Sequence, residues 1–317
     1  MSIHEPGVST EMVRHEGWHR EGAYFDAVNF TYINDPNARQ TALMTGDVDS
    51  ITSTDLKTLT LLQRSKDILI DNTPSGSALT LPMFCDVDPF TNVDVRLAMK
   101  YAINRQELID KIMFGTGTIG NDVHISSNMP YYAELEQRPY DPDKAKFHLK
   151  KAGMDKISVN LSATDSVYPG AVDMCVLYAE HAKPAGIEIK VVREPSDGYW
   201  SNVWLKKPFC FVKWGARPTP DNMFSLTYAA DAAWNESHWQ NERFNELLVQ
   251  ARAELDDTKR AEMYHEMQML SKDDGGTVLP TFVNFVCARR SNVMHGPSVA
   301  ASWENDGGRA AHRWWFA

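Results

Sequence analysis

The segment of residues 157–192 constrains the fold of this chain more than any other. Residues 157–161 and 187–192 have the length and the alternating apolar pattern of strands, and residues 170–185 between them have helical spacing. This order predicts a strand–helix–strand unit of a largely parallel sheet, because parallel strands need a crossover connection that is usually a helix. Shorter alternations of strand and helix precede it at residues 27–70, ending in a strand at 68–70, and a separate extended apolar segment follows at 77–84. The chain is therefore predicted to have an α/β fold.

Composition limits the partners that such a chain can have. Its 317 residues, 43% hydrophobic and 10% aromatic, are enough for one large or two medium domains with a real core. The formal net charge of −10 argues against nucleic acid, because phosphates demand a basic surface. No apolar run is long enough to span a bilayer, and the first residues do not have the pattern of a signal peptide.

The four cysteines, Cys85, Cys175, Cys210 and Cys287, are far apart in the sequence and form no CxxC pair. Three of them lie in apolar or aromatic runs that read as strands. We expect each to be a small buried hydrophobic residue rather than a disulfide partner or a metal ligand.

Two short motifs have the letters of catalytic or nucleotide-binding sites. Residues 15–19 read HEGWH, which fits the zinc-protease pattern, and residues 115–120 read GTGTIG, which fits a dinucleotide-binding pattern. The first needs a stable helix, but Gly17 lies inside it and no apolar helical period surrounds it. The second must leave a strand and open a helix, whereas this one leaves a helix. Both fail on context, so we predict no catalytic residue, no metal and no cofactor.

Several helices have clear start and stop signals. Asn92 or Asp94 can cap a helix that continues to about residue 103, and Asp141 followed by Pro142 starts another that ends at Gly153. Two amphipathic helices are expected at residues 242–255 and 257–271, followed by an extended segment at 277–288.

Residues 213–224 form the stretch with the strongest signal of a binding site. One glycine and two prolines argue against regular structure, yet the stretch contains Trp214, Arg217 and Asp221. A stiff loop with aromatic and charged groups suits a small-molecule site, because rigid groups lose little entropy on binding. The alternative is a surface connection in which Trp214 only fills the core.

The segment 88–105 supports a family resemblance. It reads DPFTNVDVRLAMKYAINR and resembles the signature of the peptide, nickel and opine class (family 5) of solute-binding proteins, which serve ABC importers. Segments 18–28, 46–49, 140–146 and 214–224 are similar to further segments of that family, in the same order, and the resemblance runs from about residue 13 to 317. It also places residues 15–19 in an ordinary loop of the family.

The resemblance implies a periplasmic-binding-protein-like fold of the class II (cluster C) type, with two lobes and mixed sheets. Residues 1–80 would be the remaining part of lobe one, 81–285 a complete lobe two, and 286–317 the return to lobe one. Family members begin with a signal peptide and a long first part of lobe one, which this sequence does not contain. We therefore expect a truncated lobe one that exposes apolar surface.

The resemblance also implies a function. The chain would be a substrate-binding component of an ABC importer, a non-enzymatic, monomeric protein that binds a small polar solute in an interlobe cleft and meets the importer's membrane subunits. It would be periplasmic by resemblance, and cytoplasmic if made as given without a signal peptide. The alternatives are a vestigial fragment that no longer binds, or a zinc hydrolase that uses His15, Glu16 and His19.

One position in the predicted site points to the chemistry of the solute. Peptide-binding members of the family have an aspartate that neutralises the amino terminus of the peptide. At the position that resembles it, this chain has Arg217 instead. A guanidinium suits a carboxylate or phosphate, so the hypothesis is an anionic or polyhydroxylated solute with Trp214 as a wall. The alternative is that Arg217 pairs with Asp221 and stiffens the loop. Phe84 and Asp86, at the expected first crossing between lobes, and Tyr131, which could equally be a surface aromatic, are weaker candidates. The predicted ligand-binding residues are thus Trp214, Arg217, Asp221, Phe84, Asp86 and Tyr131.

Overall fold

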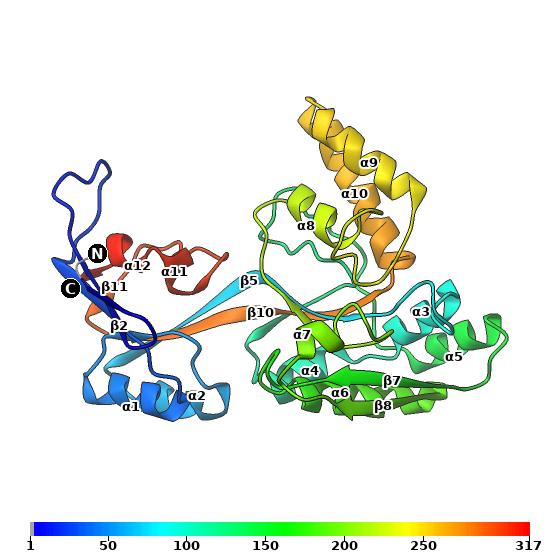
Figure 1. The fold of residues 1–317 in the computed structure, drawn as a ribbon, viewed down its shortest axis with the longest axis horizontal. Helices are drawn as coiled ribbons and strands as arrows, with labels where there is room; N and C mark the ends of the chain where they lie inside the picture. Colours follow the sequence, from blue (N-terminus) through cyan, green and yellow to red (C-terminus); the bar gives the residue numbers. More distant parts are fainter. Residues whose placement is uncertain (1–2) are drawn as a thin grey trace. The chain divides into compact units, whose positions relative to one another are not determined.

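The computed structural model describes residues 3–317, which divide into two compact units (Figure 1). Unit 1 consists of Met1–Ser75 and Asn284–Ala317, and unit 2 of Gly76–Val283. The predicted lobe boundaries at residues 80 and 285 lie within a few residues of these divisions, and the identification of the units with lobes stays a prediction. Each unit is described by itself.

The strand–helix–strand segment that constrains the sequence lies in unit 2. Strands β7 (Ile157–Ala163) and β8 (Ile187–Arg193) pair in parallel over seven residues, from Ile157 opposite Ile187 to Ala163 opposite Arg193. The helix α6 (Ala171–Ala182) and the short η2 (Lys183–Ala185) connect them. The unit is confirmed, and its sheet, which consists of the two strands β7 and β8, is parallel.

The largest sheet is built on two long strands. Strands β5 (Ile68–Pro82) and β10 (Thr277–Arg290) each begin in one unit and end in the other. The sheet has the order β4–β10–β5–β9, and β10 pairs antiparallel with β4 and β6 while β5 pairs antiparallel with β9. The sequence predicted separate extended segments at 68–70 and 77–84, whereas β5 is continuous. The short strands are β4 (Ser50–Ile51), β6 (Gly117–Ile119) and β9 (Val212–Trp214).

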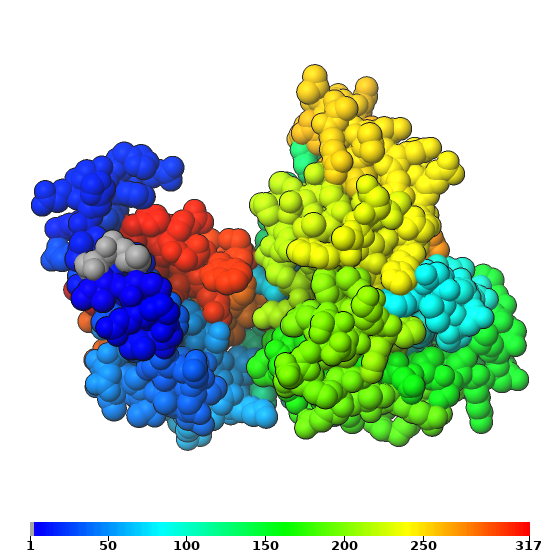
Figure 2. All heavy atoms as spheres, viewed as in Figure 1, coloured from blue at the N-terminus to red at the C-terminus, as the bar shows by residue number. Residues whose placement is uncertain are grey.

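Most α-helices of unit 2 begin at polar side chains that accept hydrogen bonds from the first free backbone N–H groups, whereas α6 and α7 begin at glycines. Asn92 caps α3, Asn104 caps α4 and Asp141 caps α5, as the sequence predicted for the first and third. The same arrangement recurs at Asn241 for α9 and Asp256 for α10, which project together from the rest of unit 2 in Figure 2. The helices are α3 (Val93–Tyr101), α4 (Arg105–Ile112), α5 (Pro142–Lys151), α7 (Tyr199–Asn202), α8 (Pro220–Thr227), α9 (Glu242–Ala253) and α10 (Asp257–Asp273).

Unit 1 has an antiparallel sheet in the order β1–β2–β3. Asp35 caps α1, and Gly46 ends it in the left-handed conformation at φ 87°. The element α11 is a left-handed turn, because Asn305, Asp306 and Gly307 all have positive φ. Besides β4, the helices and strands that lie wholly in unit 1 are β1 (Ile3–Glu5), β2 (Ser9–Val13), β3 (Ala27–Thr31), α1 (Pro36–Thr45), η1 (Leu56–Thr58), α2 (Leu59–Gln63), β11 (Val293–Met294), α11 (Glu304–Gly308), α12 (Ala310–Arg313) and β12 (Trp315–Phe316).

The burial predicted for the cysteines is found for three of the four. All four are free thiols, and three of them (Cys175, Cys210 and Cys287) are buried, while Cys85 is half-buried. Over residues 3–317, the structure contains no helix with the length and apolar character needed to cross a membrane.

Candidate functional site

The predicted loop at residues 213–224 is shorter than its prolines suggested. Trp214 ends strand β9, where it pairs with Ala78, and its carbonyl accepts a 2.8 Å hydrogen bond from the Ser77 hydroxyl. Helix α8 begins at Pro220, and the Thr219 side chain accepts from the backbone N–H of Asn222. Proline fits the first turn of a helix because no intrahelical partner exists there for its missing N–H. The irregular part is therefore only residues 215–219.

Arg217 lies in this irregular part and has no carboxylate partner among the described residues. Its Nη1 donates to the carbonyl oxygens of Gly215 (2.9 Å) and Ala216 (3.1 Å). The centre of the guanidinium lies 5.8 Å from the centroid of the Trp214 ring, within cation–π range. The guanidinium is thus half-buried and oriented by the backbone and by Trp214, while its charge is not neutralised by a neighbour.

Asp221 does not pair with Arg217. Its carboxylate forms an ion pair with Arg252 of helix α9 at 2.6 Å, and its backbone carbonyl accepts a hydrogen bond from the Ser225 hydroxyl. The alternative in which Arg217 and Asp221 neutralise each other is therefore wrong: Arg252, from thirty-one residues further along the chain, takes the carboxylate instead.

Trp214 is buried, with only 4% of its surface exposed, and it belongs to a cluster of tryptophans. Its ring centroid lies 6.3 Å from that of Trp204 and 6.0 Å from that of Trp234. Behind these rings lies Glu236, which is 1% exposed and accepts a hydrogen bond from the indole N–H of Trp204. The sequence analysis did not single out Glu236, although its spacing of two from Trp234 places a carboxyl next to an aromatic residue.

Phe84 and Asp86 meet through a third residue that the sequence analysis missed. The Phe84 ring stacks on the imidazole of His238 at 3.9 Å, and the Asp86 carboxylate contacts His238 Nδ1 at 2.9 Å. Phe84 is buried, whereas the Asp86 side chain is 61% exposed. His238 has φ 53°, so its backbone adopts the left-handed conformation at this contact.

Tyr131 is held by helix α10 and is not a free surface aromatic. Its hydroxyl donates to Asp257 (2.6 Å) and accepts from Arg260 (3.2 Å), and its ring stacks on Tyr264 at 5.2 Å. Burial raises the pKa of the Tyr264 hydroxyl to about 12, and the negative charge of Asp221 adds to this effect. Within unit 2, Trp214 thus lies near Arg217, and Phe84 and Asp86 both contact His238. Asp221 and Tyr131 have separate partners, on α9 and α10 respectively.

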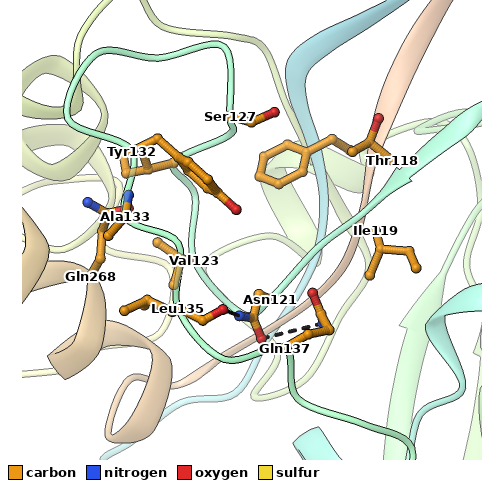
Figure 3. A pocket seen from close by; sticks show the side chains of 12 residues that line it. Thr118, Ile119, Asn121, Val123, Ser127, Tyr132, Ala133, Leu135, Gln137 and Gln268 are labelled. Atoms are coloured by element: carbon orange, nitrogen blue, oxygen red, sulfur yellow. Dashed lines mark hydrogen bonds between the residues drawn. The ribbon is translucent and has the colours of Figure 1, made fainter.

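A pocket of about 50 Å³ lies in unit 2 beside β6 and α10 (Figure 3). The Tyr132 side chain reaches into it, and none of the six predicted residues lines it. Its amides are already engaged: Asn121 donates to Glu136 O, Gln137 to Gly120 O, and Gln268 to Tyr131 O. A solute site usually encloses several hundred Å³. This pocket therefore has room for waters rather than for a solute.

The zinc motif does not form a metal site. Residues 15–19 are not helical, and the ring of His19 accepts a hydrogen bond from Arg20. Across residues 3–317, no three His, Cys, Asp or Glu side chains are grouped so that they could hold a metal ion.

A family model describes the larger part of the chain. Residues 2–236 match the model of the bacterial extracellular solute-binding proteins, family 5, middle region. Among curated proteins, the dipeptide-binding protein of Escherichia coli K12 is 26% identical over 271 residues, and the dipeptide-binding protein of Pseudomonas aeruginosa is 21% identical over 305 residues. These alignments cover 80% and 89% of this chain but 49% and 54% of the relatives. The chain thus spans about half the length of the curated relatives that it matches.

Solved structures share the fold. The periplasmic binding protein DppA of Helicobacter pylori, in complex with the peptide STSA, has a TM-score of 0.79 and 22% identity, covering 99% of this chain and 61% of that protein. The binding protein AgaA of A. tumefaciens R10, in complex with agropinic acid, has a TM-score of 0.79 and 19% identity, covering 100% and 66%. At these identities the likeness shows the fold, which is the mixed α/β fold of periplasmic binding proteins.

Proposed function

Because the chain belongs to family 5 of the bacterial extracellular solute-binding proteins, we propose that it is the solute-binding component of an ABC importer. It binds a small polar solute, opine-like, sugar-acid or peptide-like, without chemical conversion. The solute lies in a cleft between two lobes that close on it. Its other partners are the membrane subunits of the importer, and it acts as a monomer in the periplasm, the compartment named for the similar H. pylori protein.

The single observation that carries the choice of solute is the uncompensated charge of Arg217. Its guanidinium is half-buried and donates only to two backbone carbonyls, while Arg252 occupies the nearest predicted acidic partner, Asp221. A solute carboxylate would accept from the remaining N–H groups of the guanidinium in the bidentate geometry that arginine favours. Trp214, 5.8 Å from the guanidinium, would form the adjoining wall.

The relatives are consistent with an acidic solute. The A. tumefaciens protein is in complex with agropinic acid and the H. pylori protein with a peptide, and both ligands carry a carboxyl group. An arginine at position 217 favours recognition through that carboxyl group rather than through an amino terminus, because an ammonium facing a guanidinium would be repelled.

The test is a binding measurement on the full chain with chemically matched solutes. We expect agropinic acid, or a dipeptide with a blocked amino group, to raise the thermal midpoint, since binding to the folded state alone stabilises it. The same dipeptide with an amidated carboxyl terminus should not. Arg217→Ala should weaken the affinity for the solutes that raise the midpoint of the wild type by roughly 10- to 100-fold, the scale of one charge-assisted hydrogen-bonded pair.

Arg243→Ala is the matched control, because Arg243 is an arginine of the same unit that pairs with Glu266 away from the loop. Its affinity should equal that of the wild type. If Arg217→Ala bound the same solute within a factor of about two, the carboxylate contact would be excluded. If no solute of either kind shifted the midpoint, the vestigial alternative would replace the binding function.

A further inference from the structure

Four tryptophans of unit 2 form a continuous aromatic cluster next to the predicted solute loop. Ring centroids are 5.7 Å apart between Trp200 and Trp204, and 6.0 Å apart between Trp204 and Trp234 and between Trp214 and Trp234. Most of these pairs meet edge to face, the arrangement that aromatic quadrupoles favour. Trp214 is buried, whereas Trp200 and Trp234 are 51% and 43% exposed, so the cluster has a solvent side.

Glu236 lies at the buried side of this cluster and is held there by neutral donors only. Its Oε1 accepts from the Thr80 hydroxyl at 2.9 Å, and its Oε2 accepts from the Trp204 indole N–H at 2.8 Å. The Trp214 indole nitrogen lies near the same carboxyl without meeting the geometric limits of a hydrogen bond. Among the described residues, no lysine, arginine or histidine forms an ion pair with Glu236.

A buried carboxyl without a counter-ion has two accessible protonation states near neutral pH. Burial raises the pKa of Glu236 to about 7, although the N–H groups of Trp204 and Trp214 and the Thr80 hydroxyl favour the charged form. The carboxylate is therefore stabilised by these three neutral groups, and it loses acceptor capacity when it is protonated.

The neighbouring titratable groups do not change charge in the same range. Cys210 and Tyr228 both feel the charge of Glu236, and burial raises the pKa of each far above neutral. His124 packs edge to face on Trp214 and contacts the Tyr228 hydroxyl, and burial lowers its pKa to about 3. Glu194 and Lys207, which act on Cys210, pair with each other, and the pKa of Glu194 is lowered by that contact. Glu236 is thus the group whose change of charge near neutral pH should affect the tryptophan cluster.

We propose that Glu236 is the positioning residue of this tryptophan cluster: its carboxylate orients the Trp204 indole, on which the exposed Trp200 and Trp234 rings pack to form a wall for the solute, and protonation releases that indole. The role of the wall rests on the proposed function, whereas the coupling of Glu236 to the indoles does not. A solute that packs against the wall binds more tightly when Glu236 is ionised, so its affinity rises with pH through neutrality. The ligand class follows from the wall, which suits a flat or CH-rich face such as a sugar ring.

The coupling is tested on the full chain, without solute, by NMR of isotope-labelled tryptophan at increasing pH. In the wild type, the indole N–H signals of Trp204 and Trp214, assigned with Trp204→Phe and Trp214→Phe, should shift with a midpoint near neutral pH. In Glu236→Gln, which keeps the shape and cannot ionise, this titration should be absent. In Thr80→Val, which removes one donor to the charged form, the midpoint should rise by about one pH unit.

Each outcome decides between coupling and no coupling. A wild-type protein without a neutral titration of these signals, or an equal titration in Glu236→Gln, would overturn the proposal, and Thr80→Val decides it if the Gln variant does not fold. Arg217→Ala should leave the titration unchanged, so that loss of solute binding in that variant cannot imitate this result.

The wall is tested with agropinic acid as the probe: its affinity should be higher at about pH 8 than at about pH 6 in the wild type and equal in Glu236→Gln. A pH-independent affinity in the wild type would remove the wall from the solute site.

Discussion

The charged side chains in segment 88–105 hold unit 2 together rather than facing a solute. Arg96 donates to the backbone carbonyl of Asp274 at 2.7 Å, and Lys100 donates to those of Lys272 and Gly275 at 2.8 and 2.7 Å. The Lys272 carbonyl belongs to the last turn of α10 and the other two follow its end, where carbonyls lack intrahelical partners and the helix dipole favours cations. The segment that carries the family resemblance is thus informative about the fold and says nothing direct about the ligand.

Asp122 is the most enclosed acidic residue of this network and gives a sharp test of it. Its side chain is fully buried, accepts from Arg105 at 2.7 and 2.8 Å and from Arg138 at 3.0 Å, and also accepts from the Leu279 N–H. Asp122→Asn keeps the shape and tolerates the positive φ of 60°, but leaves two arginines without a buried counter-charge. We expect a loss of about 3–5 kcal/mol in the free energy of unfolding, measured with urea.

The matched control for this substitution is an exposed pair. Glu180→Gln removes the partner of Lys183, in which both side chains are more than half exposed, and should not change the urea midpoint measurably. An Asp122→Asn protein as stable as the wild type would show that the buried ion network is not needed for stability.

Asp122 also predicts the direction of a pH effect. Burial raises its pKa, but the charges of Arg105, Arg138 and Lys100 outweigh burial, so the folded-state pKa lies below the usual value. A depressed carboxyl pKa contributes stability that is present above the unfolded pKa and is lost as the pH falls through the folded pKa. The difference in unfolding free energy between wild type and Asp122→Asn should therefore narrow in acid, which urea unfolding at a series of acidic pH values would measure. A gap that widened in acid would contradict this sign.

At the scale of elements, the glycines of the GTGTIG motif have structural reasons that replace the nucleotide-binding reading. Gly115 has φ 76° and follows the end of α4, so the chain can turn there at no steric cost. A side chain on Gly117 would meet Thr281 Oγ1 at 2.9 Å, and one on Gly120 would meet the Leu279 carbonyl oxygen at 2.4 Å. Strand β6 can therefore lie against β10 only because these two positions lack a Cβ.

The close approach at Gly120 predicts the effect of a single added methyl group. Gly120→Ala forces the backbone of β10 to move, since two of the three nearest atoms are backbone atoms, the Leu279 carbonyl oxygen at 2.4 Å and the Pro280 carbonyl carbon at 3.0 Å. We expect a loss of about 1–3 kcal/mol in the free energy of unfolding by chemical denaturation. Gly296→Ala serves as the control, because no atom lies within 4 Å of its added Cβ. Equal stabilities of the two variants would argue against the tight β6–β10 contact.

The sequence predicted elements better than it predicted contacts. The caps at Asn92 and Asp141 and the strand–helix–strand segment were correct because caps, turns and periodicity are local signals. The continuous strand β5 was read as two because its middle, residues 71–76, is polar and contains proline and glycine. The pairing of Asp221 with Arg252 and the burial of Glu236 behind the tryptophans depend on residues distant in sequence, which no local pattern reveals.

At the scale of the whole molecule, the two units differ in the size of their apolar cores. The main core of unit 2 is one continuous cluster that includes strands β5, β7 and β8 and helices α3 to α10. The core cluster of unit 1 consists of Leu43, Ile51, Leu62, Ile68 and Ala288, with Val48 and Ile70 packed against it. Strand β2, the residues on either side of β3 and the C-terminal end of unit 1 leave large apolar side chains exposed, among them Val13, Tyr24, Tyr32 and Phe316.

This difference predicts that unit 1 opens before unit 2. Burial of apolar surface is the main favourable term in folding, and regions with few buried apolar contacts reach their open states at lower free energy. In hydrogen exchange followed by mass spectrometry, amides of α1 and β3 should exchange at least about 10-fold faster than amides of α3 and β7, because a difference of 1.4 kcal/mol in opening already gives that ratio. The internal control is α10, an exposed helix of unit 2 whose Tyr264 and Met267 pack into the large core and which should exchange with unit 2. Equal protection in α1 and α3 would show that the small core of unit 1 is stabilised as strongly as the large one, and the apolar residues exposed on unit 1 would then need no covering partner.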